Sequence, residues 1–351
     1  MPFTGRLGVM FSILLCASMG LAQQEVPAPK AAAPSPQSQS VRLDVVVTTK
    51  HGEEPVPGLN AADFTVVDNQ VPRKVTGFAA RDGKNSQIEV VVVVDAVNAW
   101  HRTVTFEKGE IERFLRANGG HLEYPTQLVL FTDTSTQIQN GFSKDGNMLS
   151  KGLDQLEVGL RSIRQSSGIY GESERMGLSI KALQMLIARE SVFPGRKVVL
   201  WISPGWPLLS NPWIHVDKKE QLDTFKTIEA LSTALRQARI TLYSIDPLGM
   251  TDAGTLNVSA YQSFRKPVRK PRDAQFGDLA LQILAEQTGG QVLNSSNDVT
   301  KLLDKAMKDT GAYYELSFDA AADEPDTYHA LEIKVDKAGL VARTRTGYYS
   351  R

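Results

Sequence analysis

The chain has 351 residues, of which 39 are Lys or Arg and 39 are Asp or Glu, so its formal net charge is +0. A hydrophobic fraction of 42% and a charged fraction of 22% are ordinary for globular proteins and allow a sizeable core. Because basic and acidic groups balance, the composition gives no electrostatic argument for binding nucleic acid or an anionic membrane surface, and we expect no nucleic acid partner.

The N-terminus has the pattern of a secretory signal peptide. Arg6 is the only charge before an apolar run that closes on Gly20-Leu21-Ala22, a small-x-small cleavage site. We therefore predict a signal peptide over residues 1–22, cleaved after Ala22, and a mature protein that is secreted or held in the periplasm or cell envelope. The run is short for a membrane span, and an uncleaved anchor is the alternative.

The single cysteine, Cys16, lies inside this run, so cleavage leaves a mature chain without cysteine. Disulfides, thiol catalysis and cysteine-zinc sites are then excluded from the mature protein. Residues 23–40, QQEVPAPKAAAPSPQSQS, combine Pro, Ala, Ser and Gln without any aromatic residue. Such a composition does not bury a core, so this segment is predicted to be a linker.

Strand patterns flank a longer central region. In residues 41–83, apolar residues alternate along VRLDVVVTT, and turn signals and further strand patterns follow, which predicts a small antiparallel β module. Residues 312–351 return to strand patterns, and a stretch of this length rarely forms a core alone. We therefore predict that the C-terminal strands pack with the N-terminal module, and that the central region is inserted between the two halves of one β-rich unit.

Residues 84–311 alternate between strand-like and helical segments. IEVVVVVD, which ends at Asp95, is a near-continuous apolar run, as in strands that are covered on both faces. Strand and helix patterns continue in turn through RKVVLWISPG, a helix with Asp223 as its expected N-cap, and ITLYSIDP. This alternation predicts an α/β domain with a doubly wound, mainly parallel sheet.

The order of these elements resembles the von Willebrand factor A domain. VVVVD stands at the end of the first core strand, and LVLFTDTSTQIQNGFSKD, over Leu128–Asp145, looks like that family's third strand and following loop. The flanks, VRLDVVVTTKHGEEPVPGLNAADFTVVDNQVPRKVTGF and YYELSF with HALEIKVDKAGLVARTRTGYY, resemble a bacterial family called VWFA-related, which is abundant in acidobacteria. The resemblance covers nearly the whole mature chain and places an A-like domain at residues 84–311.

The resemblance also implies a position for a metal site. Metal-binding A domains end their first strand with Asp-x-Ser-x-Ser and add a threonine and a second aspartate, which together hold Mg²⁺ or Mn²⁺ through oxygen ligands. Here Asp95 holds the first position, but Val97 and Ala99 occupy the serine positions and have no ligating oxygen. The remaining candidate ligands are Asn98, Ser166 or Ser167, and Ser203.

This pattern predicts a degenerate metal-ion-dependent adhesion site and no cofactor. We expect Asp95 to be a remnant or a structural cap that accepts N–H hydrogen bonds from the following loop. Binding of Mg²⁺ or Mn²⁺ at Asp95 is the alternative.

Aromatic and apolar residues gather in the loops expected at the carboxyl edge of the sheet. Because tryptophans are enriched as interface anchors, we predict that these residues bind a partner protein. The alternative is that they fold back over the sheet as a local core. The residues are Trp100, Trp206, Leu208, Leu209 and Trp213.

The sequence contains none of the catalytic motifs G-x-S-x-G, H-E-x-x-H, the P-loop or G-x-G-x-x-G. His101 and His215 could approach Asp95 for acid–base work, which leaves a hydrolase of unknown substrate as a distant alternative. The predicted function is therefore exported, non-catalytic protein–protein interaction, as an adhesion or scaffold protein. A metal-dependent adhesion domain that uses Asp95 is the first alternative.

Overall fold

The structure, a computed structural model, describes residues 40–83, 86–155, 168–209, 216–248, 260–320 and 323–350. Residues 38–351 form one compact unit. The predicted signal peptide and nearly all of the predicted linker lie outside the described residues. Within the described ranges, no helix is long and apolar enough to cross a membrane.

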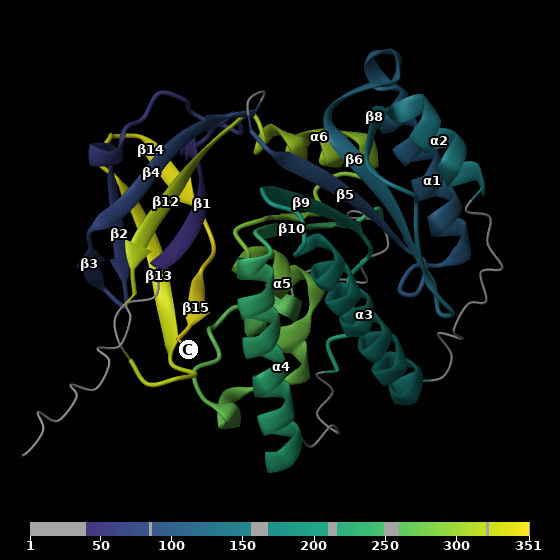
Figure 1. The fold of residues 1–351 in the computed structure, drawn as a ribbon. Coiled ribbons are helices and arrows are strands. Elements are labelled where there is room, and N and C mark those ends of the chain that lie inside the picture. Colours follow the sequence, from purple (N-terminus) through teal and green to yellow (C-terminus); the bar gives the residue numbers. More distant parts are fainter. Residues whose placement is uncertain are drawn as a thin grey trace, which may run out of the picture. The chain divides into compact units, whose positions relative to one another are not determined.

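A seven-stranded sheet occupies the middle of the α/β region, in the order β11-β10-β9-β5-β6-β7, with β8 also paired to β6 (Figure 1). Strand β5 pairs in parallel with β6 on one side and with β9 on the other, whereas β7 and β8 run antiparallel to β6. The strands are β5 (Ile88–Asp95), β6 (His121–Phe131), β7 (Thr136–Ile138), β8 (Ser143–Asp145), β9 (Arg196–Ile202), β10 (Ile240–Ile245) and β11 (Val292–Leu293). The prediction of a mainly parallel sheet is confirmed.

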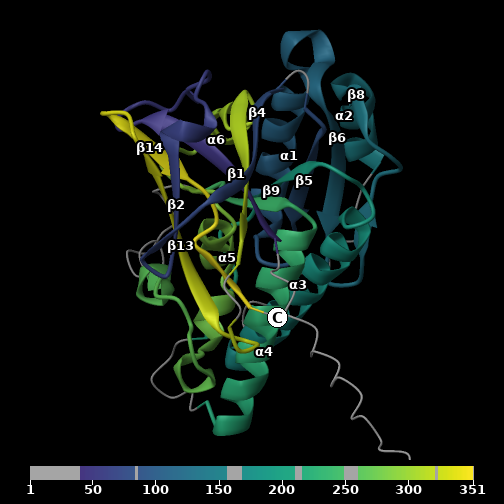
Figure 2. The ribbon, with the colours of Figure 1, turned by 60° about the vertical axis from the view of Figure 1, so that its left-hand side comes forward.

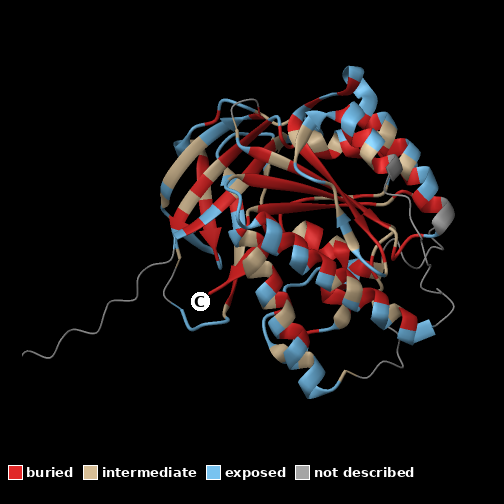
Figure 3. Cartoon of the chain, turned by 45° about the vertical axis from the view of Figure 1, so that its right-hand side comes forward, coloured by how far each residue is buried: buried red, intermediate tan, exposed pale blue. Residues whose placement is uncertain are grey.

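Helices cover both faces of this sheet, so its central strands are buried along most of their length (Figure 3). Val91, Val93 and Trp201 pack against α3, α4 and α5 on one face. Val92, Val94 and Leu200 pack against α1, α2 and α6 on the other. This double burial explains the near-continuous valines of β5. The helices are α1 (His101–Arg116), α2 (Gly146–Gln155), α3 (Gly168–Glu190), α4 (Lys218–Gln237), α5 (Leu281–Gln287) and α6 (Val299–Lys308).

Helix α4 begins at Lys218, earlier than predicted, and its N-cap is Asp217. Oδ1 of Asp217 accepts the backbone N–H groups of Lys219 and Glu220, both at 2.8 Å, and the Glu220 carboxylate accepts the N–H of Asp217 at 2.9 Å. This capping box satisfies the free N–H groups of the first turn. The prediction that Asp223 is the N-cap is therefore wrong, because the helix has already started when it reaches Asp223.

The N- and C-terminal segments form two four-stranded sheets, in the orders β14-β1-β12-β4 and β15-β13-β2-β3 (Figure 2). Strand β1 pairs antiparallel with β12, which places Val45 opposite Tyr314, and β2 pairs antiparallel with β13. Their shared core contains Leu43, Val66 and Leu316. The strands are β1 (Ser40–Thr49), β2 (Phe64–Asp68), β3 (Val71–Arg73), β4 (Val75–Asp82), β12 (Ala312–Asp319), β13 (Tyr328–Val335), β14 (Leu340–Arg343) and β15 (Gly347–Tyr349).

The described residues also form short 3₁₀ helices: η1 (Ala61–Asp63), η3 (Ala117–Gly120), η5 (Ala260–Phe264), η6 (Pro271–Asp273) and η7 (Phe276–Leu279).

The two four-stranded sheets share one core, and we call them the sandwich. An ion-pair network joins the sandwich to the central sheet. The guanidinium of Arg239, in the turn before β10, lies 2.6 Å from Oδ1 of Asp44 on β1 and 2.7 Å from Oε1 of Glu315 on β12.

Candidate functional site

The central sheet has its topological switch point between β5 and β9. From β5 the chain moves to β6 on one side, and from β9 it moves to β10 on the other. Ligands of open α/β sheets bind at such a point, beyond the carboxyl ends of the strands. Asp95 ends β5, and Ser203 follows β9, so the structure brings two of the predicted candidates together here.

The Asp95 carboxylate is fully buried and surrounded by donors from the protein. Its Oδ1 accepts the backbone N–H groups of Val97 at 3.1 Å and Asn98 at 3.0 Å. Its Oδ2 accepts the Asn98 side-chain amide at 2.9 Å and the indole N–H of Trp201 at 3.0 Å. The hydroxyl of Ser203 also hydrogen-bonds to this carboxylate. The loop after β5 therefore wraps back onto the end of its own strand.

This arrangement does not fit a divalent cation. A carboxylate offers about four lone-pair positions, and the N–H groups of Val97, Asn98 (backbone and side chain) and Trp201 occupy all of them. The indole N–H of Trp201 occupies a lone pair of Oδ2 that a cation bound to this oxygen would need. Val97 and Ala99 add no oxygen ligand, and elsewhere in the described ranges no group of three or more His, Cys, Asp or Glu side chains is arranged to hold a metal.

Asn98 connects this carboxylate to helix α3. Its side-chain amide also donates to Oγ of Ser179 at 2.9 Å, and the Ser179 hydroxyl donates to the backbone carbonyl of Arg175 at 2.8 Å. Burial raises the pKa of Asp95, and the hydrogen bonds from Asn98, Trp201 and Ser203 oppose that rise. The result is a polar cluster that joins the β5 end, the start of the following loop and α3, and within it the buried Oδ1 of Asn98 has no hydrogen-bond partner.

Trp201 and Ser179 belong to this cluster but are not among the site residues predicted from the sequence. A signal existed for Trp201: a tryptophan within a fully buried strand needs a partner for its N–H group, and the neighbouring strand ends in a carboxylate. Ser179 gave no such signal, because a serine within a helix usually hydrogen-bonds its own backbone.

The structure corrects the predicted partner-binding surface of aromatic and apolar residues at the carboxyl edge of the sheet. Trp206 is only 3% exposed and packs edge-on against Trp201, with ring centroids 5.2 Å apart. Leu208 and Leu209 are partly buried, against the cluster that contains Phe264 and against the main core. These three residues form local core, because the loop after β9 folds back over the sheet and excludes water from the indole. Trp213 lies outside the described residues.

Trp100 remains as an accessible member of the predicted surface, since 53% of it is exposed. It precedes the first turn of α1 at the carboxyl edge of the sheet. Two residues that the sequence analysis did not single out accompany it: Ile169 and Tyr170, at the start of α3, are 43% and 86% exposed. The bond between Asn98 and Ser179 joins the middle of α3 to the loop before Trp100, and Ile169 and Tyr170 lie about 14 Å from Ser179 along the helix, towards its N-terminus. We call Trp100, Ile169 and Tyr170 the apolar rim.

Glu107, on α1, is a further titratable group near this edge. Its carboxylate is fully buried, and neither oxygen has a hydrogen-bond partner. Burial, together with the negative charges of Asp95 and Asp246, raises the pKa of Glu107 well above its ordinary value. The remaining candidates cannot be placed: Ser166, Ser167 and His215, and the side chain of His101, lie outside what the structure describes.

No model of a known protein family matches this sequence, and no curated protein does. Solved structures that this chain matches include manganese-loaded TRAP protein from Plasmodium vivax, which is 10% identical with a TM-score of 0.38; the match covers 78% of this chain and 98% of that one. The ArnB paralog VWA2 from Sulfolobus acidocaldarius is 12% identical with a TM-score of 0.34, over 86% of this chain and 76% of that one.

The pilus adhesin SpaC from Lactobacillus rhamnosus GG, in its open conformation, is 9% identical with a TM-score of 0.40. The match covers 85% of this chain but only 49% of SpaC, so the chain spans about half the length of that adhesin. The fold assignment therefore rests on the strand order of this chain itself.

Proposed function

We propose that this protein is an exported, non-catalytic protein–protein interaction module of the VWFA-related type. In this proposal the carboxyl edge of the central sheet presents the apolar rim to a protein partner, and no metal ion bridges the two. The signal-peptide pattern at residues 1–22 supports export.

The saturation of Asp95 is the observation that carries the proposal. A metal-bridged adhesion site needs a carboxylate with free lone pairs beside an open coordination position. The donors from Val97, Asn98 and Trp201 remove both, yet they also make the edge rigid. A rigid edge with exposed aromatic side chains suits binding by apolar contact, because little conformational entropy is lost when a partner docks.

The test compares capture of proteins from an envelope extract of the native host by three proteins: wild type, Trp100→Ala/Tyr170→Ala, and Val341→Ala. Val341 is 43% exposed on β14, so it controls for loss of an exposed apolar side chain elsewhere. We expect a specific partner retained by wild type and Val341→Ala in the presence of EDTA, and lost with the double variant. Capture that EDTA abolishes, or that survives the double substitution, would overturn the proposal.

A further inference from the structure

Strand β4 is one edge of the β14-β1-β12-β4 sheet, and its outer side has free main-chain groups. The N–H of Gly83 donates to the carbonyl of Gly311 at 2.8 Å, so these two residues form a hydrogen-bonded pair. In an antiparallel ladder every second residue forms such a pair, so Gly83 shows which residues of β4 bond to β12. Arg81, Ala79 and Gly77 therefore direct their N–H and C=O groups towards β12. Phe78 and Ala80 direct theirs outward, and among the described residues no backbone hydrogen bond reaches those outward groups.

An open edge of this length is a template for another strand unless the protein blocks it. Proline would block it, but β4 contains none, and its middle carries the small residues Gly77, Ala79 and Ala80. The guanidinium of Arg81 turns inward across the sheet, where it pairs with Glu315 at 3.1 Å. Within β4 itself, neither a proline nor the Arg81 side chain blocks the outer side, and η1 lies near the strand.

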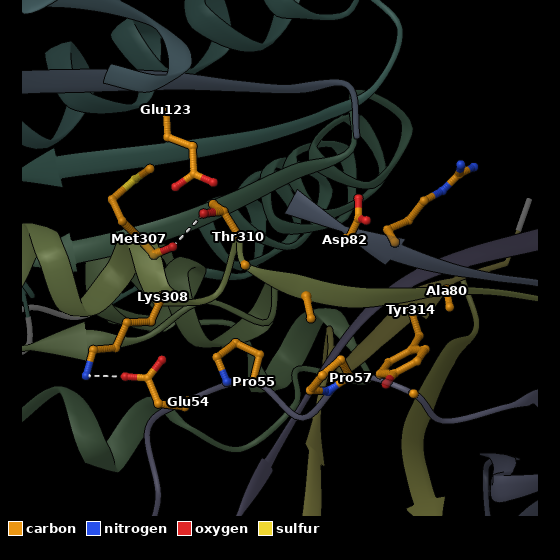
Figure 4. Close-up of a pocket in the computed structure, with 14 residues that line it drawn as sticks. Glu54, Pro55, Pro57, Ala80, Asp82, Glu123, Met307, Lys308, Thr310 and Tyr314 are labelled. Carbon is orange, nitrogen blue, oxygen red and sulfur yellow. Dashed lines mark hydrogen bonds and ion pairs between the residues drawn. The ribbon is translucent and has the colours of Figure 1, made fainter. Parts of the chain in front are cut away.

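A cavity of about 750 Å³ lies at the C-terminal end of β4 (Figure 4). Its apolar lining comes from Pro55 and Pro57 in the loop after β1, from Met307 on α6, and from Tyr314 on β12. The loop is held in place because the Tyr314 hydroxyl donates to the carbonyl of Val56 at 2.6 Å. Because Asp82 precedes β5, the cavity lies at the amino edge of the central sheet, opposite the apolar rim.

The charges around the cavity favour a cation. Three carboxylates line it, from Glu54, Asp82 and Glu123, against two cations, Arg81 and Lys308. Both cations are already engaged, Arg81 by Glu315 as described and Lys308 by Glu54 at 2.8 Å. Within the described part of the chain, no cation forms an ion pair with Glu123, which is exposed at the start of β6.

Edge and cavity are geometrically continuous. Phe78 packs into the sandwich core, and Ala80 and Asp82 share its face by the two-residue repeat of a strand. Both Ala80 and Asp82 line the cavity. In a strand added outside β4, the residues opposite Ala80 and Asp82 project to that same face, so their side chains enter the cavity beside Glu123.

We propose that β4 and this cavity bind an extended segment of a partner protein by strand addition, with a lysine or arginine side chain seated beside the carboxylate of Glu123. Main-chain hydrogen bonds to Phe78 and Ala80 supply the pairing, and Glu123 selects a basic side chain. This surface is separate from the apolar rim, so it stands or falls independently of the proposed function.

The test uses a fluorescently labelled synthetic peptide of about ten alternating threonine and lysine residues, long enough to cover β4. Two control peptides separate the contributions. One replaces lysine by glutamate, and the other keeps lysine but carries N-methyl groups along one edge, which prevents main-chain pairing. Binding to the full chain is followed by anisotropy at physiological ionic strength, where non-specific attraction is screened.

Variants locate the site. Ala80→Pro removes one outward N–H group without disturbing the bonds to β12, and Ala80→Ser is its matched control. Glu123→Lys reverses the cavity charge, and Glu332→Lys makes the same change at an exposed position on β13. We expect the threonine–lysine peptide to bind wild type, Ala80→Ser and Glu332→Lys alike, and Ala80→Pro and Glu123→Lys at least about tenfold more weakly. Amide exchange at Phe78 and Ala80 should slow when the peptide binds.

Equal binding of the N-methylated peptide would show charge attraction without strand addition and would overturn the proposal. The proposal would also be overturned if Ala80→Pro bound the peptide as tightly as wild type while keeping its melting temperature. It would equally be overturned if wild type bound none of the peptides.

Discussion

The indole N–H of Trp201, on β9, donates a 3.0 Å hydrogen bond to Oδ2 of Asp95, at the end of the adjacent strand β5. The two residues are 106 positions apart in the sequence, and the parallel pairing of Val94 with Ile202 brings them to the same edge of the sheet. A buried carboxylate without a donor would be costly. Trp201 thus helps to satisfy this buried carboxylate with donors from the protein alone.

Replacing Trp201 by Phe should remove this donor while keeping an aromatic ring in the core. The Asp95 oxygen would lose one partner in a fully buried position, so we expect a loss of about 1–3 kcal/mol in the free energy of unfolding. Urea denaturation monitored by circular dichroism measures it. Trp206→Phe is the matched control, because the buried Nε1 of Trp206 has no hydrogen-bond partner. Equal losses in the two variants would show that the Asp95 bond contributes nothing.

Divalent cations should not stabilise the protein. A ligand present at about a hundred times its Kd adds roughly 2.7 kcal/mol, which would raise the melting temperature visibly. For wild type we expect the melting temperature in millimolar Mg²⁺, Mn²⁺ or Ca²⁺ to equal that in EDTA, because the lone pairs of Asp95 are occupied. For Asp95→Ala, too, the melting temperature should not change between these solutions. A rise seen in wild type and abolished in Asp95→Ala would contradict the closed-site description.

Glu107 should make the protein less stable as the pH rises. Its folded pKa lies well above the ordinary value of 4.5, so the folded state keeps a proton that the unfolded state releases. The contribution is fully present below about pH 4.5 and is lost as pH rises towards the folded pKa, by at most about 1.4 kcal/mol per pH unit.

The measurement is the free energy of unfolding as a function of pH, between about pH 5 and pH 8, where the raised pKa of Glu107 should make it decline. We expect Glu107→Gln to be more stable than wild type at the upper end and to show a shallower decline. Glu174→Gln, at an exposed position on α3, serves as the control and should follow wild type. Parallel curves for wild type and Glu107→Gln would mean that Glu107 ionises normally in the fold.

The ion pairs of Arg239 should contribute more to the free energy of unfolding than an exposed ion pair does. Its guanidinium bridges Asp44 and Glu315, and all three side chains are at most 16% exposed. Arg239→Met would leave two poorly hydrated carboxylates facing each other, at a cost of about 2–4 kcal/mol by urea denaturation. Arg81 also pairs with Glu315, but 43% of its side chain is exposed, so Arg81→Met should cost under about 1 kcal/mol. Similar costs would show that the Arg239 bridge is no stronger than an exposed pair.

Local patterns explain why part of the fold was predictable. Double burial of β5 is visible in five consecutive valines, Val90–Val94, because a strand covered on both faces cannot alternate. The structural role of Asp95 could also be inferred, since the next residues offer backbone N–H groups but no ligating hydroxyl. Asp223 was mistaken for an N-cap because helical periodicity locates an element more reliably than its end.

The burial of Trp206 could not be read in the same way. A tryptophan in a loop is equally suited to an interface and to a local core, and only the path of the loop over Trp201 distinguishes the two. Likewise, no sequence pattern around Glu107 predicts that its carboxylate is fully buried.

By itself, the sequence determined the alternation of strands and helices, the presence of a single cysteine, Cys16, and the absence of serine at positions 97 and 99 after Asp95. These properties follow from residue type and short-range spacing. Tertiary structure alone decided that Trp201 and Ser179 close the Asp95 cluster, that Arg239 joins the sandwich to the sheet, and that β4 lies at an edge beside an acidic cavity. Each of these depends on residues far apart in the chain, and their meeting is set by strand order and register, which no local pattern encodes.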